Sequence, residues 1–170
     1  MTQPVGAPIH FLDPCAFLVA GSQLLAALKV AKNTGVIAFH GDPSVNNIVR
    51  TKDGTYYLID CGEAETVTDT MVRSRRGDAW ATTWLYAHEL VSDENVRSFN
   101  TDAFALVLSL IALLIGKWSA VKGRRSKIAQ CMQEYDGGKH PKISNILSMA
   151  VMANDATECA NLPTLESWQY

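Results

Sequence analysis

The sequence HGDPSVNN at residues 40–47 places a carboxylate and an amide five residues apart in a polar loop. Thirteen residues after this loop, the sequence DCG at 60–62 supplies a second carboxylate. Carboxylate and amide oxygens are the hard ligands that Mg²⁺ prefers, and phosphoryl transfer depends mainly on positioning and charge stabilisation. We therefore expect Asp42, Asn47 and Asp60 to form a magnesium–phosphate site.

The segment between the two motifs has the pattern of a β-hairpin. Ile48-Val49 starts a short apolar run, Lys52-Asp53-Gly54 has the composition of a tight turn, and residues 55–59 form the returning strand. Because a hairpin brings its two ends together, we expect Asp60 to lie beside the polar loop.

Taken in order, these motifs resemble the protein kinase superfamily. The HGDxxxxN pattern resembles the catalytic loop, and the D-x-G at 60–62 resembles the metal-binding segment that follows it. Downstream, ATTWLYAHE at 81–89 resembles the end of a kinase activation segment, and TDAFAL at 101–106 resembles the opening of the buried central helix of the large lobe. Four such motifs in the family's order are far more specific than any one of them.

The resemblance implies a phosphate site with ATP and Mg²⁺ as cofactors. Asp42 would be the catalytic residue that orients the substrate hydroxyl, and Asn47 and Asp60 would hold Mg²⁺. Val49 and its neighbours would form the floor under the adenine. Without the other two residues, Asp42 would be read as an ordinary loop aspartate that makes turn hydrogen bonds.

The resemblance also implies four structural residues. His40 would brace the loop from below, and Asp102 would tie the loop backbone down, with simple helix capping as the alternative for Asp102. Glu89 would normally pair with an arginine, and His140 falls where that arginine is expected, which would make the pair sensitive to pH.

The expected fold is a single domain over 1–170, mainly α with a small β-hairpin (α+β), similar to a protein kinase C-lobe that lacks the N-terminal β-rich lobe. Asn100-Thr101-Asp102 offers N-caps for the central helix, and Gly116 would end it. The expected parts are a helix before the catalytic loop at 22–34, the catalytic loop at 40–47, a polar, irregular activation-type segment within 60–89, a central buried helix at 101–116, and C-terminal helices within 128–152.

Composition indicates a reducing compartment, with the cytoplasm expected and the nucleus as an alternative. Apolar residues make up 48% and charged residues 19% of the chain, and the net charge is −2, which does not favour a nucleic-acid or anionic-membrane surface. The four cysteines lack metal-binding spacing. The longest apolar run, Phe104 to Ile115, is shorter than the ~20 residues that a membrane span requires.

Three functions are compatible with these features. The first is a divergent protein kinase-like phosphotransferase acting on a protein hydroxyl, whose nucleotide site needs another chain, a second copy or further sequence, because no glycine-rich phosphate loop and no strand lysine occur here. The second is an inactive pseudokinase-type interaction or regulatory module. The third is a small-molecule kinase relative, suggested by the HGD sequence.

Several positions depart from the kinase pattern. Gly41 and Ser44 replace an arginine and a lysine, Cys61 replaces a phenylalanine, and His88 replaces a proline. An exposed apolar surface is expected where the missing lobe would sit, and a protein partner or a homo-oligomer would cover it.

Overall fold

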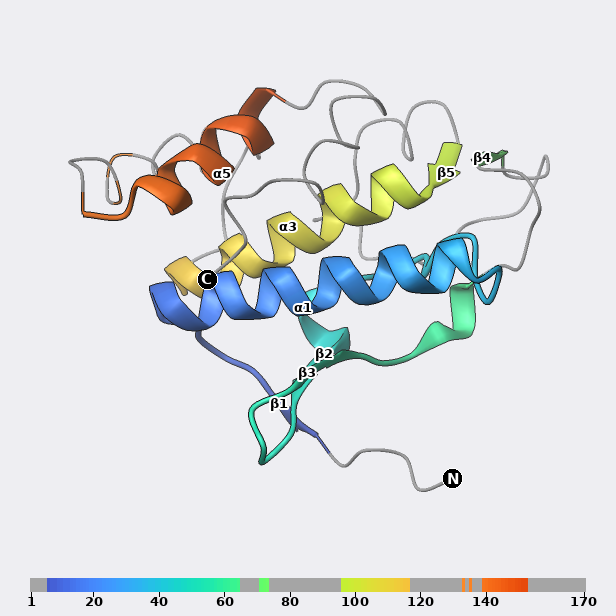
Figure 1. The fold of residues 1–170 in the computed structure, drawn as a ribbon, viewed down its shortest axis with the longest axis horizontal. Helices are drawn as coiled ribbons and strands as arrows, with labels where there is room; N and C mark the ends of the chain where they lie inside the picture. Colours follow the sequence, from blue (N-terminus) through green and yellow to red (C-terminus); the bar gives the residue numbers. More distant parts are fainter. Residues whose placement is uncertain are drawn as a thin grey trace.

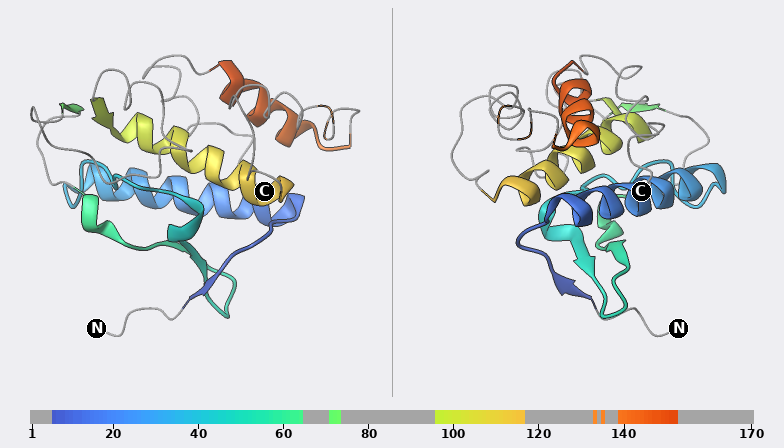
Figure 2. Two further views of the ribbon diagram at one scale, coloured as in Figure 1. Left: turned by 180° about the vertical axis from the view of Figure 1, so that it is seen from behind. Right: turned by 60° about the vertical axis from the view of Figure 1, so that its left-hand side comes forward.

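The computed structural model describes residues 6–64, 71–73, 96–116, 133, 135 and 139–152. Figure 1 shows helix α1 between a small sheet on one side and helix α3 on the other, with helix α5 beyond α3. The two further views in Figure 2 show the same order of layers. The elements are β1 (Ala7–Pro8), α1 (Pro14–Asn33), β2 (Ile48–Arg50), β3 (Tyr56–Leu58), β4 (Met71–Arg73), β5 (Val96–Ser98), α3 (Phe99–Ile115) and α5 (Pro141–Met152), with single 3₁₀ turns at Val45–Asn47 and Cys61–Glu63.

Helix α1 begins at Pro14, so the prediction of a start at residue 22 was wrong. Asp13 caps this helix by accepting a hydrogen bond from the backbone N–H of Ala16 at 2.8 Å, and proline suits the first helical position. Gly21 lies inside the helix and is buried. Gly21 therefore does not mark a helix boundary here.

Helix α3 begins at Phe99 and is capped by Ser98 rather than by residues 100–102. Ser98 Oγ accepts a hydrogen bond from the N–H of Thr101 at 3.2 Å, and Thr101 Oγ1 accepts one from the N–H of Ser98 at 3.0 Å. This reciprocal pair satisfies two backbone donors. The predicted end is confirmed, because Gly116 follows the helix with φ of 61°.

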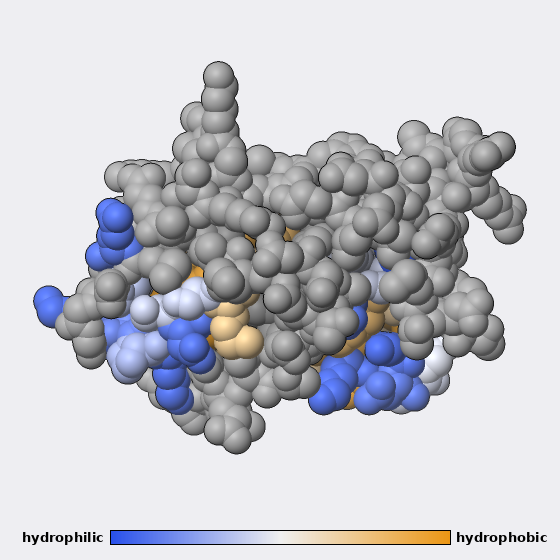
Figure 3. All heavy atoms as spheres, turned by 90° about the horizontal axis from the view of Figure 1, so that it is seen from above, coloured by the Kyte–Doolittle hydropathy of each residue, from blue (hydrophilic) through white to orange (hydrophobic). Residues whose placement is uncertain are grey.

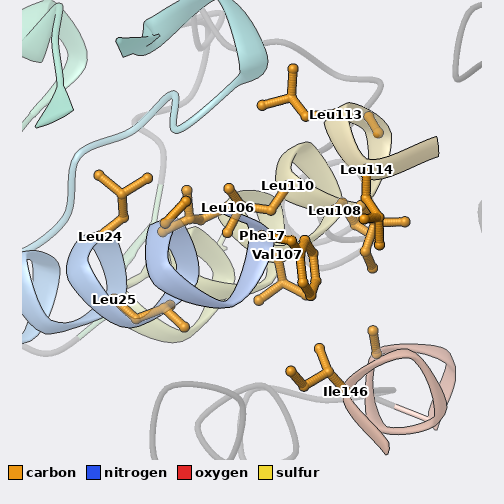
Figure 4. Packing of buried hydrophobic residues seen from close by; sticks show 14 of the residues in the cluster. Phe17, Leu24, Leu25, Leu106, Val107, Leu108, Leu110, Leu113, Leu114 and Ile146 are labelled. Carbon is orange, nitrogen blue, oxygen red and sulfur yellow. The ribbon is translucent and has the colours of Figure 1, made fainter. Parts of the chain in front are cut away.

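The core lies where the two long helices meet. In Figure 4, Phe17 of α1 lies close to Val107 of α3, and Ile146 of α5 faces the same cluster. Nearly every residue of α3 is buried, so this helix is surrounded on all sides, as its composition predicts. In the view from above, the described residues show hydrophilic side chains in two groups, with hydrophobic atoms visible beside each group (Figure 3).

Within the described part of the chain, α1 is the one helix that is long and apolar enough to cross a membrane, with 20 residues. Its side chains at Phe17, Leu24 and Leu28 are buried in the core, and 39% of its most apolar 18-residue stretch is buried. Core helices often pass the same length and composition test.

The predicted hairpin is confirmed. Strands β2 and β3 pair antiparallel with Val49 opposite Tyr57, and the turn lies at residues 51–55. A third strand, β1, was not predicted; it pairs with β2 so that Pro8 lies opposite Val49. The coarse expectation of a mainly helical chain with a small antiparallel β-structure therefore holds.

Two further elements modify the predicted plan. β4 pairs antiparallel with β5, although residues 71–73 were expected to be irregular. α5 begins at Pro141, and Gln133 and Tyr135 are also helical within the predicted C-terminal region of 128–152. Proline suits the first position of α5, because its missing N–H would have no partner within the helix there.

We predict that Leu106→Ala destabilises the protein by about 2–5 kcal/mol, because Leu106 is fully buried in α3 and its truncation leaves a cavity. The free energy of unfolding from denaturant titration measures this loss. Val30→Ala is the matched control, since Val30 is 60% exposed and its truncation leaves stability nearly unchanged. Equal effects of the two substitutions would contradict the assigned core.

Candidate functional site

The polar loop brings the side chains of Asp42 and Asn47 into contact. Asn47 Nδ2 donates hydrogen bonds to the backbone oxygen of Asp42 at 2.8 Å and to its Oδ2 at 3.0 Å. Ser44 Oγ donates to the same Oδ2 at 3.4 Å. The 3₁₀ turn at Val45–Asn47 produces this geometry, since it carries the amide back over the carboxylate. The carboxylate and amide therefore form one partly buried cluster.

Asp60 lies at the end of the hairpin, beside this cluster. The N–H of Ile59 donates to the backbone oxygen of Asn47 at 2.9 Å, so the residue before Asp60 is bonded directly to the loop. Asp60 is exposed and has left-handed backbone angles, with φ of 61°. Its Oδ1 accepts a hydrogen bond from the N–H of Gly62 at 3.4 Å.

The donor set suits a hard cation bound to phosphate. Because Nδ2 of Asn47 is used by Asp42, its Oδ1 is left as an acceptor, and no residue of the described chain donates to it. Asp60 offers a solvent-facing carboxylate at the adjoining strand end. No group of three or more His, Cys, Asp or Glu residues suited to a metal occurs among the residues described, so any ion would rely on an amide ligand and on phosphate or water.

Asp102 of α3 holds the loop from inside the core. Its carboxylate accepts hydrogen bonds from the backbone N–H of His40 and from that of Gly41, the latter at 3.1 Å to Oδ2. Burial raises the pKa of Asp102 to about 6, and the repulsion from Asp42 acts in the same direction, while the two N–H donors and the charge of Arg97 oppose it. Asp102 is therefore mostly ionised at pH 7 and binds the loop as a carboxylate.

Ser109 provides a second attachment that sequence reasoning missed. Its Oγ donates to the backbone oxygen of Pro43 at 3.0 Å and also to that of Ala105 at 2.9 Å. Ser109 follows Asp102 by seven residues, so the two lie on one face of α3. Ser109 is the single polar residue between Ala103 and Ile115, which was the available signal.

His40 lies beneath the loop and is neutral at pH 7. Its ring Nδ1 accepts a hydrogen bond from the N–H of Asp42 at 3.3 Å, which places the proton on Nε2. Burial lowers the pKa of His40, partly offset by the Ile59 backbone and by the charges of Asp42 and Asp60. The contact with Asp42 gives His40 a positioning role in the loop.

Arg97 is a further buried charge that the sequence did not signal. It is 1% exposed, its guanidinium carbon lies 5.9 Å from the centre of the Phe39 ring, and its charge lowers the pKa of Asp102. An arginine at a strand position normally reads as a surface residue.

Val49 is covered, although it was expected to form an open floor. It is 5% exposed, and a Cβ built on Gly6 would lie 2.6 Å from its Cγ2. The N-terminal segment therefore lies directly on Val49. Tyr57 and Ile59, which alternate along the same face of the hairpin, remain 37% and 40% exposed.

Of the expected pair of Glu89 and His140, only His140 lies among the described residues. His140 is half-buried, its ring meets that of Tyr135 edge to face at 5.7 Å, and its backbone oxygen accepts from the N–H of Ser144. Glu89 lies outside the described residues, as do most of the 60–89 segment and the cysteines at 131 and 159. Cys15 and Cys61 are exposed free thiols.

No protein-family model matches this chain, and no curated protein sequence is significantly similar to it. The case for a function therefore rests on the contacts of the polar loop and the hairpin.

We predict a specific pH dependence of stability from Asp102. Its pKa rises from 3.8 to about 6 on folding, so protonation favours the folded state. The stability associated with this group is fully present below about pH 4 and is lost as pH rises through 6. At ~1.4 kcal/mol per pKa unit the loss is about 3 kcal/mol.

Asp102→Asn isolates this effect because asparagine does not titrate. Denaturant unfolding of both proteins from pH 4 to pH 7 should show the free energy of the wild type falling relative to that of Asp102→Asn. A difference that does not change with pH would contradict the raised pKa.

Proposed function

We propose that the polar loop and the end of the hairpin bind Mg²⁺ and the phosphates of a nucleotide, and that the chain is a divergent protein kinase-like phosphotransferase lobe. The observation that carries the proposal is the hydrogen bond of 3.0 Å between Asn47 Nδ2 and Asp42 Oδ2, on a loop that the hairpin joins to Asp60. The order and spacing of the motifs support the same class of protein.

The chemistry assigned to each residue follows from its surroundings. Asp42 would accept a hydrogen bond from the attacking hydroxyl, because its carboxylate is partly buried and held by Asn47 and Ser44. Asn47 Oδ1 and the Asp60 carboxylate would hold the ion, which when bound would neutralise phosphate charge. Asp102 and Ser109 would keep the loop backbone fixed, so the site would need little rearrangement.

The nucleotide site needs groups from outside the described residues. No glycine-rich phosphate loop and no strand lysine with a partner glutamate occur in the sequence, so charge stabilisation at the β- and γ-phosphates has to come from another polypeptide or further sequence. The choice of a protein hydroxyl as acceptor rests on the resemblance of residues 81–89 to a substrate-binding segment.

A second candidate is a pseudokinase-type interaction module. Val49, the residue proposed to support the adenine, is covered by Gly6 and paired through β1. A nucleotide base could reach it only after the N-terminal segment moved away. This contact favours a lobe that binds partners and does not turn over ATP.

We predict that ATP with Mg²⁺ raises the melting temperature of the wild type more than either ligand alone, because binding to the folded state stabilises it. Asp60→Ala should abolish the extra rise, since it removes a carboxylate ligand. Asp53→Ala at the tip of the same hairpin is the matched control, and it should keep the rise relative to its own melting temperature. Equal rises in all three proteins would contradict the assigned ion site.

We predict that Asp42→Ala lowers magnesium-dependent ATP hydrolysis by about 100-fold, the usual scale for loss of a positioned acid–base group. The same variant should keep the thermal shift with ATP and Mg²⁺, because Asp42 is assigned to the nucleophile and not to the ion. A wild type that shows neither the thermal shift with ATP and Mg²⁺ nor turnover would assign the chain to the interaction module. Loss of both shift and turnover in Asp42→Ala would contradict the division of roles.

A further inference from the structure

A groove of about 390 Å³ runs between helix α1 and strand β3, which lie side by side in Figures 1 and 2. Its walls are mainly apolar, and none of its lining side chains carries a charge at pH 7, because His40 is neutral there. The lining residues are Gln23, Ala27, Leu28, Ala31, Ile37, His40, Thr55, Tyr56, Tyr57, Leu58 and Cys61.

Strand β3 forms the edge of its sheet on this side. The order of strands is β1-β2-β3, so among the described residues β3 has a neighbouring strand on one side only. The N–H of Ile59 bonds to the backbone oxygen of Asn47, and the N–H of Thr51 bonds to that of Thr55. These bonds show which residues of β3 turn their backbone groups toward β2 and which turn them away. By this alternation the backbone groups of Tyr56 and Leu58 point away from β2, toward the groove.

One of these outward groups already has a side-chain partner. The N–H of Tyr56 donates to Gln23 Oε1 of α1 at 2.9 Å, so a side-chain amide stands where a neighbouring strand would place a carbonyl. The N–H of Leu58 has no hydrogen-bond partner in the part of the chain that the structure describes. An unpaired edge beside an apolar wall is a template for another strand.

His40 lines the groove as a buried ring, 1% exposed, whose Nδ1 accepts a hydrogen bond from the N–H of Asp42. Hydrogen bonding to the Ile59 backbone raises its pKa against the lowering by burial. Among the described residues, the unpaired backbone donor beside the groove is therefore the N–H of Leu58.

The rim of the groove is apolar as well. Val30 and Val36 are 60% and 62% exposed; Val30 lies one helical turn from Ala27, and the N–H of Val36 bonds to the backbone oxygen of Ala31. Apolar side chains gathered around an open strand edge are typical of a protein contact.

We propose that this groove binds an extended, uncharged segment of a partner protein, which adds to the sheet as a fourth strand beside β3. Its backbone would accept a hydrogen bond from the N–H of Leu58, and every second side chain would lie against Ala27, Ala31 and Ile37. The edge supplies backbone pairing, and the uncharged wall selects apolar side chains at alternate positions. None of Asp42, Asn47 and Asp60 lines the groove, so the segment would not contact the proposed catalytic and ion-binding side chains.

The test uses two pools of synthetic hexapeptides with blocked ends. In one pool Val, Ile or Leu alternates with Ser, Thr or Gln; in the other, Asp replaces the apolar positions. Fluorescence anisotropy should show binding of the apolar pool and none of the acidic pool. Ala27→Glu should raise Kd at least about tenfold, which is ~1.4 kcal/mol, because it places a charge against the apolar segment.

Ala26→Glu is the matched control, because Ala26 is exposed on the same helix but does not line the groove. Its Kd should stay close to that of the wild type, and both variants should keep the wild-type circular dichroism. Amide hydrogen exchange adds a direct readout: the apolar pool should slow exchange at Leu58, which only strand pairing at this edge would do.

Three results would overturn the proposal. They are no binding of the apolar pool, equal binding to Ala26→Glu and Ala27→Glu, or binding without added protection at Leu58. Self-association in sedimentation velocity that Ala27→Glu abolishes would assign the groove to a second copy of the chain instead. Neither Ala26→Glu nor Ala27→Glu changes a proposed ion ligand. If this peptide-binding test fails, the thermal shift with ATP and Mg²⁺ therefore still tests the proposed function separately.

Discussion

The arrangement of the polar loop depends on the carboxylate of Asp102. This group lies in the most apolar helix of the chain and is almost fully buried, so it needs hydrogen-bond donors to remain ionised. The N–H groups of His40 and Gly41 supply them. The pKa of about 6 shows that these bonds and Arg97 do not fully offset burial. The helix and the loop therefore fix each other, since neither could keep its geometry if the other moved.

Much of the fold could be predicted because its signals are local. The turn composition at residues 52–54 predicted the hairpin, and Gly116 predicted the end of α3. The missed features depend on contacts between distant segments. β1 pairs with β2 across some forty residues of chain, and the burial of Gly21 inside α1 is visible only once the core is assembled. Local sequence carries no signal for either contact.

In the candidate site, too, the features set by local sequence were predicted and those set by contacts between distant segments were missed. Spacing was enough to single out Asp42 and Asn47, because five residues and a turn bring the two side chains together. The left-handed backbone at Asp60 could not be predicted, since asparagine and glycine are the usual residues there. Arg97 was missed because an arginine reads as exposed unless its charge partner is known. Ser109 was missed because one hydroxyl in an apolar helix has many roles, and only the loop position reveals this one.

His40 connects the two surfaces that the hairpin separates. One nitrogen of its ring accepts a hydrogen bond from the N–H of Asp42, and the same ring lines the groove beside β3. Ile59 adds a second link, because it continues β3 and its N–H bonds to the backbone oxygen of Asn47. A strand added at the groove would therefore lie next to the polar loop through His40 and Ile59, without contacting the carboxylates themselves.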